Sequence, residues 1–257
     1  MKQLNQFIQL LFIVGILLSH LGCSTSKKVL TPLVVPDFEF SPPNSTQNSN
    51  SSIVISLIEP MYTGNFAYAH ESPFLQFRKN MSLDFQEILV GRGYKLKGPF
   101  EAYDLMTYSD KTECELGLEI QIDLNLMETS GGWKHVPSSG NPYSFKKENY
   151  STYKSTLNLS GTISISIIET FTKQKLIVKS VPVPQENIAV VAESTYEFGT
   201  TGFPLNDPGV HNPLAVALSR LYKTTTQRGW DLLANEDLEH ALKQVPEIRT
   251  NAGFIKR

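Results

Sequence analysis

The sequence predicts an α+β fold, with a largely antiparallel sheet, two long amphipathic strands and helices packed on one face. The first observation is a strict alternation of apolar and polar residues over 116–126, and the second is the same alternation over 157–167. Such strands have one buried and one wet face, which favours an antiparallel sheet because parallel sheets are usually covered on both faces. The third observation is that helical patterns stand before and after the strands, which favours helices covering a single sheet face.

Four shorter strands are predicted around the two long ones. Residues 53–58 are a β-branched run that is apolar on both faces and ends at Glu59-Pro60, as in an interior strand. Pro182 and Pro184 restrict the last two short strands to edges or turns, because proline cannot donate a hydrogen bond to a strand ladder. The other three short strands are residues 94–96, 176–181 and 188–192.

Helices are predicted on either side of the strands. Over residues 73–90, apolar side chains recur at steps of three and four, which gives a helix with one apolar stripe. A second helical region begins at Asn212-Pro213 and continues or restarts before Pro246. The residues that can begin or end the first helix are Ser72 as its cap, Pro73 in its first turn, and Gly91 or Gly93 at its end.

The N-terminal stretch indicates an exported lipoprotein. Residues 1–22 contain a basic Lys2, an apolar run and a small residue, Gly22, immediately before Cys23, which is the outline of a bacterial export signal. We predict that this signal peptide is removed and that Cys23 carries acyl chains such as palmitate. His20 departs from the pattern, since such signals usually carry leucine there. One alternative is a retained transmembrane helix, but such a helix needs about 20 apolar residues and the run here is shorter. The other alternative is a buried cysteine thiol.

Residues 23–52 are predicted to be a flexible tether that begins at the lipid-anchored cysteine. From residue 41 onward the segment is almost entirely Ser, Pro, Asn, Thr and Gln, which cannot bury enough apolar surface to become ordered. As a flexible coil, the tether has an r.m.s. end-to-end distance of roughly 30 Å. The apolar residues 33–35 can instead dock on the domain and shorten that reach. Residues 53–250 are predicted to form a single α+β domain.

Composition excludes several classes of function. The formal net charge is −2, and it becomes −3 once residues 1–22, which carry Lys2 and no acid, are removed. No nucleic-acid partner is expected without clustered positive charge. The five histidines lack metal-ligand spacing, and neither a phosphate-binding glycine loop nor a nucleophile elbow occurs. We therefore expect that the protein is not an enzyme and that it has no cofactor and no metal site.

The second cysteine, Cys114, is interpreted as a buried residue without a reactive role.

The connection between the two long strands holds the candidate ligand-binding residues. Residues 127–153 lack a clear periodic pattern, and a connection this long is often functional. Aromatic rings can stack on apolar faces of sugars, and lysine can pair with the carboxylate of an acidic sugar. The alternative is that the aromatic rings fold back over the sheet and the lysines are solvated. The candidates are Trp133, Lys134, Tyr143, Lys146 and Lys147.

The order of these features resembles the neuraminyllactose-binding hemagglutinin family of Helicobacter surface lipoproteins. The likeness covers nearly all of residues 53–250. It implies a paralogue of the flagellar-sheath adhesin, whose best-known form is proposed to bind sialyl-lactose through a dense Lys/Arg cluster. The corresponding loop here lacks that cluster, so sialic-acid binding does not carry over residue by residue. The stretches that carry the likeness are Glu59-Pro60, Gly91-Arg92-Gly93-Tyr94-Lys95, the alternating strand to Leu126, and Leu159-Ser160-Gly161 leading to Ile167-Ile168-Glu169.

Two functions follow from the lipid anchor and the resemblance. The first is a non-enzymatic, adhesin-like lipoprotein of the outer membrane, displayed at the cell surface or flagellar sheath, whose partner is a host glycan. The second is an inward-facing envelope or flagellar-sheath structural lipoprotein that binds another protein. In both cases the protein meets the membrane through the lipid on Cys23.

Overall fold

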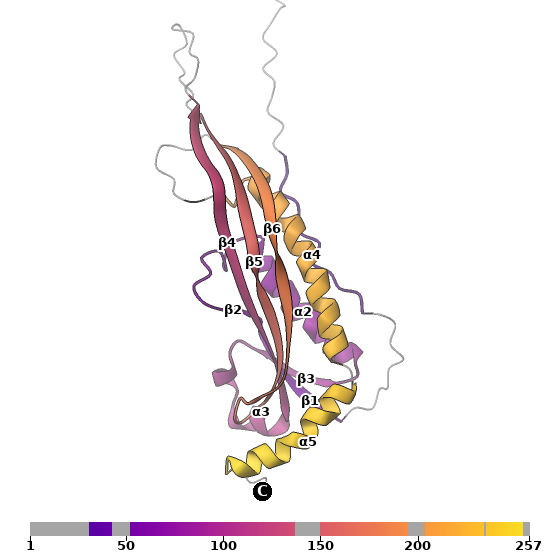
Figure 1. Ribbon diagram of the computed structural model, residues 1–257. Helices are drawn as coiled ribbons and strands as arrows, with labels where there is room; N and C mark the ends of the chain where they lie inside the picture. The colour runs from indigo at the N-terminus through magenta and orange to yellow at the C-terminus, as the bar shows by residue number, and fades with distance from the viewer. Residues whose placement is uncertain are drawn as a thin grey trace, which may run out of the picture. The chain divides into compact units, whose positions relative to one another are not determined.

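The computed structural model describes residues 31–42, 52–136, 150–194, 202, 204–233 and 235–253 (Figure 1). Residues 1–32 and 33–257 are separate units, and every element named below belongs to the second. Helices and strands both occur, which confirms the α+β class. The elements are β1 Val54–Ile58, β2 Met61–Tyr62, α2 Phe74–Gly91, β3 Lys95–Phe100, the 3₁₀ helix η1 Tyr103–Leu105, α3 Tyr108–Glu113, β4 Leu116–Val136, β5 Tyr150–Glu169, β6 Lys175–Ser194, α4 Pro208–Leu232 and α5 Asn235–Asn251.

The strands form one mixed sheet in the order β3-β1-β4-β5-β6, with β2 paired to β4. β5 is antiparallel to both β4 and β6, whereas β1 is parallel to both β3 and β4, and β2 is parallel to β4. The predicted largely antiparallel sheet is therefore only partly correct. The reason is that α2 connects β1 to β3 as a crossover, and such a connection joins parallel strands. The interior position predicted for residues 53–58 is confirmed, since β1 lies between β3 and β4.

The two alternating runs pair with each other. Their apolar side chains are buried, while intervening polar residues such as Asp123 and Asn125 are exposed. The predicted pair of amphipathic antiparallel strands is confirmed. Residues opposite one another on β4 and β5 include Leu118 and Ile167, Ile120 and Ile165, Ile122 and Ile163, and Leu126 and Leu159.

Both long strands extend past their predicted ends. β4 continues to Val136 and β5 begins at Tyr150. Regular strand pairing therefore occupies much of residues 127–153, the connection in which no periodic pattern was found. A register shift after Glu128 interrupts the ladder, and Gly131 follows it with φ at 103°. Such a bulge inserts an extra residue and disturbs the alternation, although backbone pairing resumes beyond it. The apolar pattern ends at this point for that reason, and the strand continues.

The two strands predicted over 176–181 and 188–192 are a single strand, β6. It lies at one edge of the sheet, as its prolines predicted. Pro182 lies opposite Thr162 in the ladder, and the register shifts nearby between Leu159 and Gly161. A proline on an edge strand can direct its missing N–H to the open side, so β6 continues through both prolines.

The cap predicted for the first helix is wrong. The N-cap of α2 is Pro73, which makes no side-chain capping hydrogen bond. The Ser72 hydroxyl is instead 2.6 Å from Gln76 Oε1 and 2.8 Å from His211 Nε2, so a tertiary contact with α4 occupies it. At the other end, Gly93 has φ at 86°, and its N–H donates to a carbonyl of the last helical turn. The glycine ending is confirmed.

The helix boundaries predicted at Pro213 and Pro246 are also wrong, because both prolines lie inside helices. α4 begins before the first proline, where Asp207 accepts a hydrogen bond from a first-turn N–H, and α5 continues beyond the second. Val210, which precedes Pro213 in α4, is buried, and so is Arg249, which follows Pro246 in α5. This packing outweighs the preference of proline to interrupt a helix.

The main core lies between one face of the sheet and the helices α2 and α4, which lie side by side behind it in Figure 1. The helices approach closely at Gly229 of α4, where an added Cβ would overlap the Phe85 ring of α2. Tyr222 of α4 donates from its hydroxyl to Asp84 Oδ2 of α2 at 2.7 Å. Burial raises the pKa of Asp84, an effect that this hydrogen bond partly offsets.

A smaller core covers the opposite face of the sheet at the β1 end. Successive strand residues point to opposite faces. Accordingly, Ile167 lies in the main core and Ile168 in the smaller one, with Ile58, Tyr103 and Met106. The last two residues belong to the segment around η1 and α3. The prediction of helices on one face therefore holds for α2 and α4, while this short helical segment covers part of the other face.

Residues 33–42 pack along α2 and α4, and we call this segment the N-terminal strap. Near the start of α4, the Val34 N–H donates to Asn212 Oδ1 at 2.8 Å. Further along the same helix, Lys223 lies 2.8 Å from a carboxylate oxygen of Asp37. The strap therefore follows α4 in the direction of the helix, within the segment that was predicted to be tether.

Phe38 fixes the strap in the main core. Its side chain is 2% exposed, and its ring centroid lies 5.5 Å from that of Phe77 and 5.1 Å from that of Tyr222. The three residues that the sequence singled out for docking are more exposed: Leu33 at 48%, Val34 at 44% and Val35 at 87%. The strap thus docks chiefly through an aromatic residue that follows them.

Candidate functional site

Trp133 and Lys134 lie on β4 near its upper end, which with the start of β5 we call the hairpin end. Trp133 faces the core side of the sheet, opposite Tyr153, and the two ring centroids are 5.2 Å apart. Lys134 is exposed, and as the next residue along the strand it belongs to the opposite face. Strand geometry therefore separates the aromatic ring from the lysine that we expected beside it.

The aromatic pair is held by hydrogen bonds. Trp133 Nε1 donates to the carbonyl of Gly202 at 3.1 Å. The Tyr153 hydroxyl donates to Glu128 Oε1 at 2.9 Å, and the same oxygen accepts from Ser155 Oγ at 2.7 Å. Burial raises the pKa of Tyr153 to about 12, with a further contribution from the Glu128 hydrogen bond. The ring of Trp133 is thus fixed, with part of its surface accessible to a ligand.

On the outer face, the hairpin end carries two exposed lysines. Lys154 lies opposite Gly132, which shares a face with Lys134 two residues away. On the other side of Lys154 in the ladder is Val191, which is 52% exposed. Two ammonium groups on one face can attract an anion. Lys154 was not singled out from the sequence, because its proximity to Lys134 depends on the register of the hairpin.

Four of the predicted site residues lie outside the described residues. These are the lipid-attachment residue Cys23 and the loop candidates Tyr143, Lys146 and Lys147. The signal peptide, residues 1–22, also lies outside them. Their roles stay predictions.

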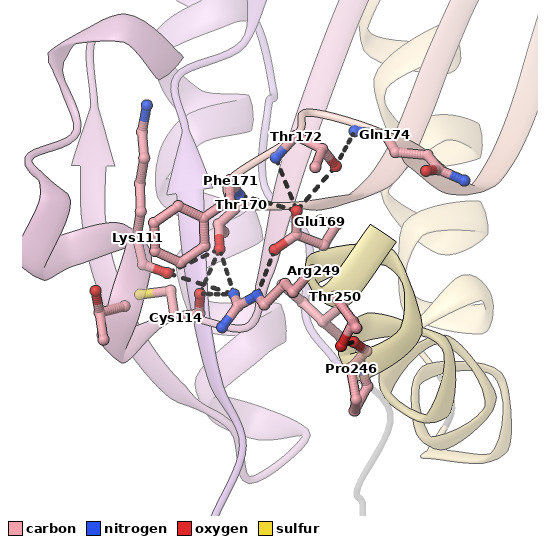
Figure 2. Close-up of polar contacts among 12 residues, drawn as sticks. Lys111, Cys114, Glu169, Thr170, Phe171, Thr172, Gln174, Pro246, Arg249 and Thr250 are labelled. Carbon is pink, nitrogen blue, oxygen red and sulfur yellow. Dashed lines mark hydrogen bonds and ion pairs between the residues drawn. The ribbon is translucent and has the colours of Figure 1, made fainter. Parts of the chain in front are cut away.

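At the opposite end of the sheet is a buried polar cluster that the sequence did not predict (Figure 2). Its centre is Glu169, whose side chain is fully buried. Oε1 accepts from Arg249 Nε at 2.7 Å, while Oε2 accepts from the backbone N–H groups of Thr172 at 2.8 Å and Phe171 at 3.0 Å. Burial by itself raises the pKa of Glu169, but these hydrogen bonds outweigh it and hold the pKa below its ordinary value.

The guanidinium of Arg249 connects Glu169 to a second part of the chain. One of its terminal nitrogens, Nη2, donates to Thr170 Oγ1 at 3.0 Å, and to the carbonyls of Cys114 at 3.3 Å and Lys111 at 3.4 Å. The cluster thereby joins α5, the β5–β6 turn and the end of α3. Because its polar groups are hydrogen-bonded to one another, we interpret it as structural. Arg249 and Glu169 are 80 residues apart, so no local pattern could have identified the pair.

His211 and Cys114 are each held inside the domain. Nε2 of His211 is 2.8 Å from the Ser72 hydroxyl. Cys114 is fully buried, as predicted, and burial raises the pKa of its thiol to about 11. In the described part of the chain, no three or more His, Cys, Asp or Glu side chains lie close enough to hold a metal. Over the same residues, no helix is both long and apolar enough to cross a membrane.

Comparison with known proteins gives a likeness of fold. No family model matches the chain, and no curated protein matches it. A solved structure of a neuraminyllactose-binding hemagglutinin homolog from Helicobacter pylori matches with a TM-score of 0.56 and 16% identity, over 83% of this chain and 100% of the other. A protein of Xanthomonas campestris matches with a TM-score of 0.35 and 10% identity, over 82% and 99% of the two chains. A lipoprotein of Neisseria meningitidis matches with a TM-score of 0.25 and 12% identity, over 66% and 97%.

The first of these matches bears on the resemblance stated above. Its TM-score and coverage show that the hemagglutinin homolog has a similar fold over 83% of this chain. At 16% identity the likeness concerns the fold alone. The fold-level part of the resemblance is therefore confirmed, and membership in the family, a lipid anchor and a ligand are matters for a proposal.

Proposed function

We propose that this chain is a non-enzymatic, lipid-anchored binding protein of the outer envelope, adhesin-like in role and related to the hemagglutinin family. The observation that carries this proposal is the fold shared with the hemagglutinin homolog, which extends over 83% of the chain. Gly22-Cys23 at the end of an apolar run supports the anchor. Acyl chains each contribute about 0.8 kcal/mol per buried CH₂, so several chains on Cys23 hold the protein stably at a membrane.

The anchor is tested by incorporation of a labelled fatty acid into the full chain expressed in a bacterium. We expect the label in the wild-type chain and in Cys114→Ser, and its loss in Cys23→Ser. Cys114→Ser is a matched control because it removes the other cysteine. Label that persists in Cys23→Ser contradicts the anchor.

The ligand-binding surface is proposed at the hairpin end. Exposed Lys134 and Lys154 on the outer face suit the carboxylate of an acidic glycan, and the partly buried ring of Trp133 on the other face suits an apolar sugar face. Tyr143, Lys146 and Lys147 follow Lys134 in the chain and are proposed to contribute. Because Trp133 also packs against Tyr153, its truncation would disturb the hairpin, and the lysines are better probes.

A glycan array tests this surface with a chain that lacks residues 1–22 and carries Cys23→Ser. We expect binding to acidic glycans, its loss in the double variant Lys134→Ala/Lys154→Ala, and its retention in Lys179→Ala. Lys179 is an exposed lysine of β6 away from the hairpin end, so it controls for the loss of charge. Absence of binding to sialylated and neutral glycans alike contradicts the adhesin role.

The second candidate is an inward-facing envelope or flagellar-sheath structural lipoprotein that binds another protein. The N-terminal strap favours it, because packing of residues 33–42 shortens the chain available to carry the domain away from its own membrane. Protease treatment of intact cells separates the two candidates. Cleavage of the domain on intact cells supports surface display, whereas protection until the outer membrane is broken supports the inward-facing role.

A further inference from the structure

We propose that the hairpin end of the domain faces the lipid surface that holds Cys23, with Lys134 and Lys154 directed toward anionic headgroups. The proposal rests on the lipid anchoring proposed above and adds the orientation of the domain and the chemistry of the surface it meets. It is an alternative to the glycan surface proposed at the same two lysines, because lysines held against headgroups of the protein's own membrane are not displayed to a host glycan.

The strap enters the domain at the hairpin end. Its first contact is Val34 with Asn212, near the start of α4. One turn earlier in α4, Gly209 packs so closely on β6 that an added Cβ would overlap the carbonyl oxygen of Val191. Val191 lies opposite Lys154 in the sheet, beside the hairpin end. The same arrangement is visible in Figure 1, where the strap, the start of α4 and the hairpin end lie together and α5 lies at the other end of the sheet.

The reach of the anchored chain then limits the orientation. Ten residues separate Cys23 from Val34, and at about 3.6 Å per residue that length spans at most ~40 Å when fully extended. The strand from Gly132 down to Leu116 is longer, ~54 Å at about 3.4 Å per residue. An inverted domain, with the β5–β6 turn on the lipid, would require the chain to span that greater length. The hairpin end is therefore the end that the anchor keeps near the membrane.

The reach of the chain sets the orientation, and the side chains at the hairpin end suit a lipid surface. Lys134 and Lys154 are exposed at the hairpin end, and basic residues near an anionic membrane surface are attracted to it. The strap residues Leu33 and Val35 add exposed apolar side chains at the same end, which suit the headgroup boundary. At the opposite end, the charge is mixed, since Lys173 and Lys175 are exposed at the β5–β6 turn, where both pair with Glu119. The exposed acidic residues of α5 are Glu236, Asp237, Glu239 and Glu247.

Energy transfer to the lipid surface tests the orientation. The full acylated chain carrying Cys114→Ser is reconstituted in vesicles of phosphatidylethanolamine and phosphatidylglycerol that contain an acceptor dye on the headgroup. A donor dye is placed at Thr152→Cys, at the hairpin end, or at Gln174→Cys, in the β5–β6 turn. Acylated Cys23 has no free thiol to take the dye. We expect strong quenching at position 152 and much weaker quenching at position 174.

Each outcome separates the orientation from the anchor. Equal quenching at the two positions, or stronger quenching at 174, in a chain whose acylation is verified by mass overturns the orientation and leaves the anchor standing. Absence of acyl chains overturns the anchor and the orientation with it. For the lysines, Lys134→Glu/Lys154→Glu is expected to reduce quenching at 152 in these vesicles and not in phosphatidylcholine vesicles. If the double substitution changes quenching at position 152 equally in both kinds of vesicle, the proposed headgroup contact is overturned.

Discussion

Arg249 Nε and Glu169 Oε1 form an ion pair at 2.7 Å in which the side chains are 9% and 0% exposed, so one buried contact ties the C-terminal helix to the end of β5. Burying two charges carries a large desolvation penalty, which their attraction and additional hydrogen bonds offset. Removing one partner leaves the other charge buried without compensation. The pair is therefore a point at which a single substitution has a large effect on stability.

We predict that Arg249→Met lowers the free energy of unfolding by about 3–5 kcal/mol, the range for loss of one partner of a buried pair. The matched control is Arg220→Met, since Arg220 pairs with Glu186 but its side chain is 62% exposed. Exposed pairs contribute about 0–1 kcal/mol. Urea unfolding followed by circular dichroism measures both. Equal losses for the two variants would show that the Arg249 pair is not buried as described.

The same cluster predicts a dependence of stability on pH. The pKa of Glu169 in the folded protein lies below its ordinary value of 4.5, because hydrogen bonds outweigh the effect of burial. A depressed pKa means that the stabilisation is present above pH 4.5 and is lost as the pH falls through the pKa of the folded state. Glu169→Gln should therefore be less stable than wild type at neutral pH, with a difference that shrinks below pH 4.5. A difference that is constant with pH contradicts this assignment.

Phe38→Ala is predicted to release the N-terminal strap. Truncation of a buried phenylalanine typically costs about 3–5 kcal/mol. A terminal segment can open before the rest of the domain unfolds, so the first sign should be cleavage within residues 33–42 by a protease at native conditions. Val35→Ala is the control in the same segment, because Val35 is 87% exposed. Equal cleavage of the two variants would contradict the role given to Phe38.

Much of the sheet could be predicted because its pattern is local. The alternating runs around Ile122 and Ile163 identified both long strands, and their pairing follows from adjacency in the chain. The parallel strands could not be predicted in the same way, since the pairing of β1 with β3 and β4 depends on tertiary packing. The helix ends at Pro213 and Pro246 were misplaced because packing outweighed a local preference.

The candidate site was predictable only in part. The sequence singled out Trp133 and Lys134 from their residue types, but their positions on opposite faces follow from the extension of β4 beyond the bulge. Lys154 joins Lys134 through strand register, which residue types alone do not specify. Phe38 lies in the segment 23–52 that was predicted to be a tether, ahead of its polar part, and its buried ring packs that stretch against the core.

Cys114 is predicted to be unreactive in the folded protein. It is fully buried, and burial raises the pKa of its thiol to about 11, so little of the reactive thiolate exists at neutral pH. In the Cys23→Ser chain, we expect no reaction with a thiol-specific reagent under native conditions and one reacting thiol in urea. Cys23→Ser/Cys114→Ser should show none in either condition. Rapid native labelling of Cys114 would mean that the α3 segment opens readily.

Two glycines at the interface of α2 and α4 are predicted to respond oppositely to alanine. At Gly229, an added Cβ would overlap the ring of Phe85, so Gly229→Ala should force the helices apart and cost about 1–3 kcal/mol, the usual range for overpacking. At Gly91, an added Cβ would lie 3.6 Å from the Trp230 ring, an ordinary contact. Gly91→Ala should be neutral or stabilising, by up to ~1 kcal/mol, because alanine favours the helix.

Urea unfolding of the two single variants measures the contrast, and a third variant identifies its cause. If the overlap with Phe85 is what destabilises Gly229→Ala, then adding Phe85→Leu should recover part of the loss, because a smaller side chain leaves room for the new methyl group. The cavity left by Phe85→Leu alone should be less costly in the presence of Gly229→Ala for the same reason. Strict additivity of the two substitutions would exclude a direct contact between these residues.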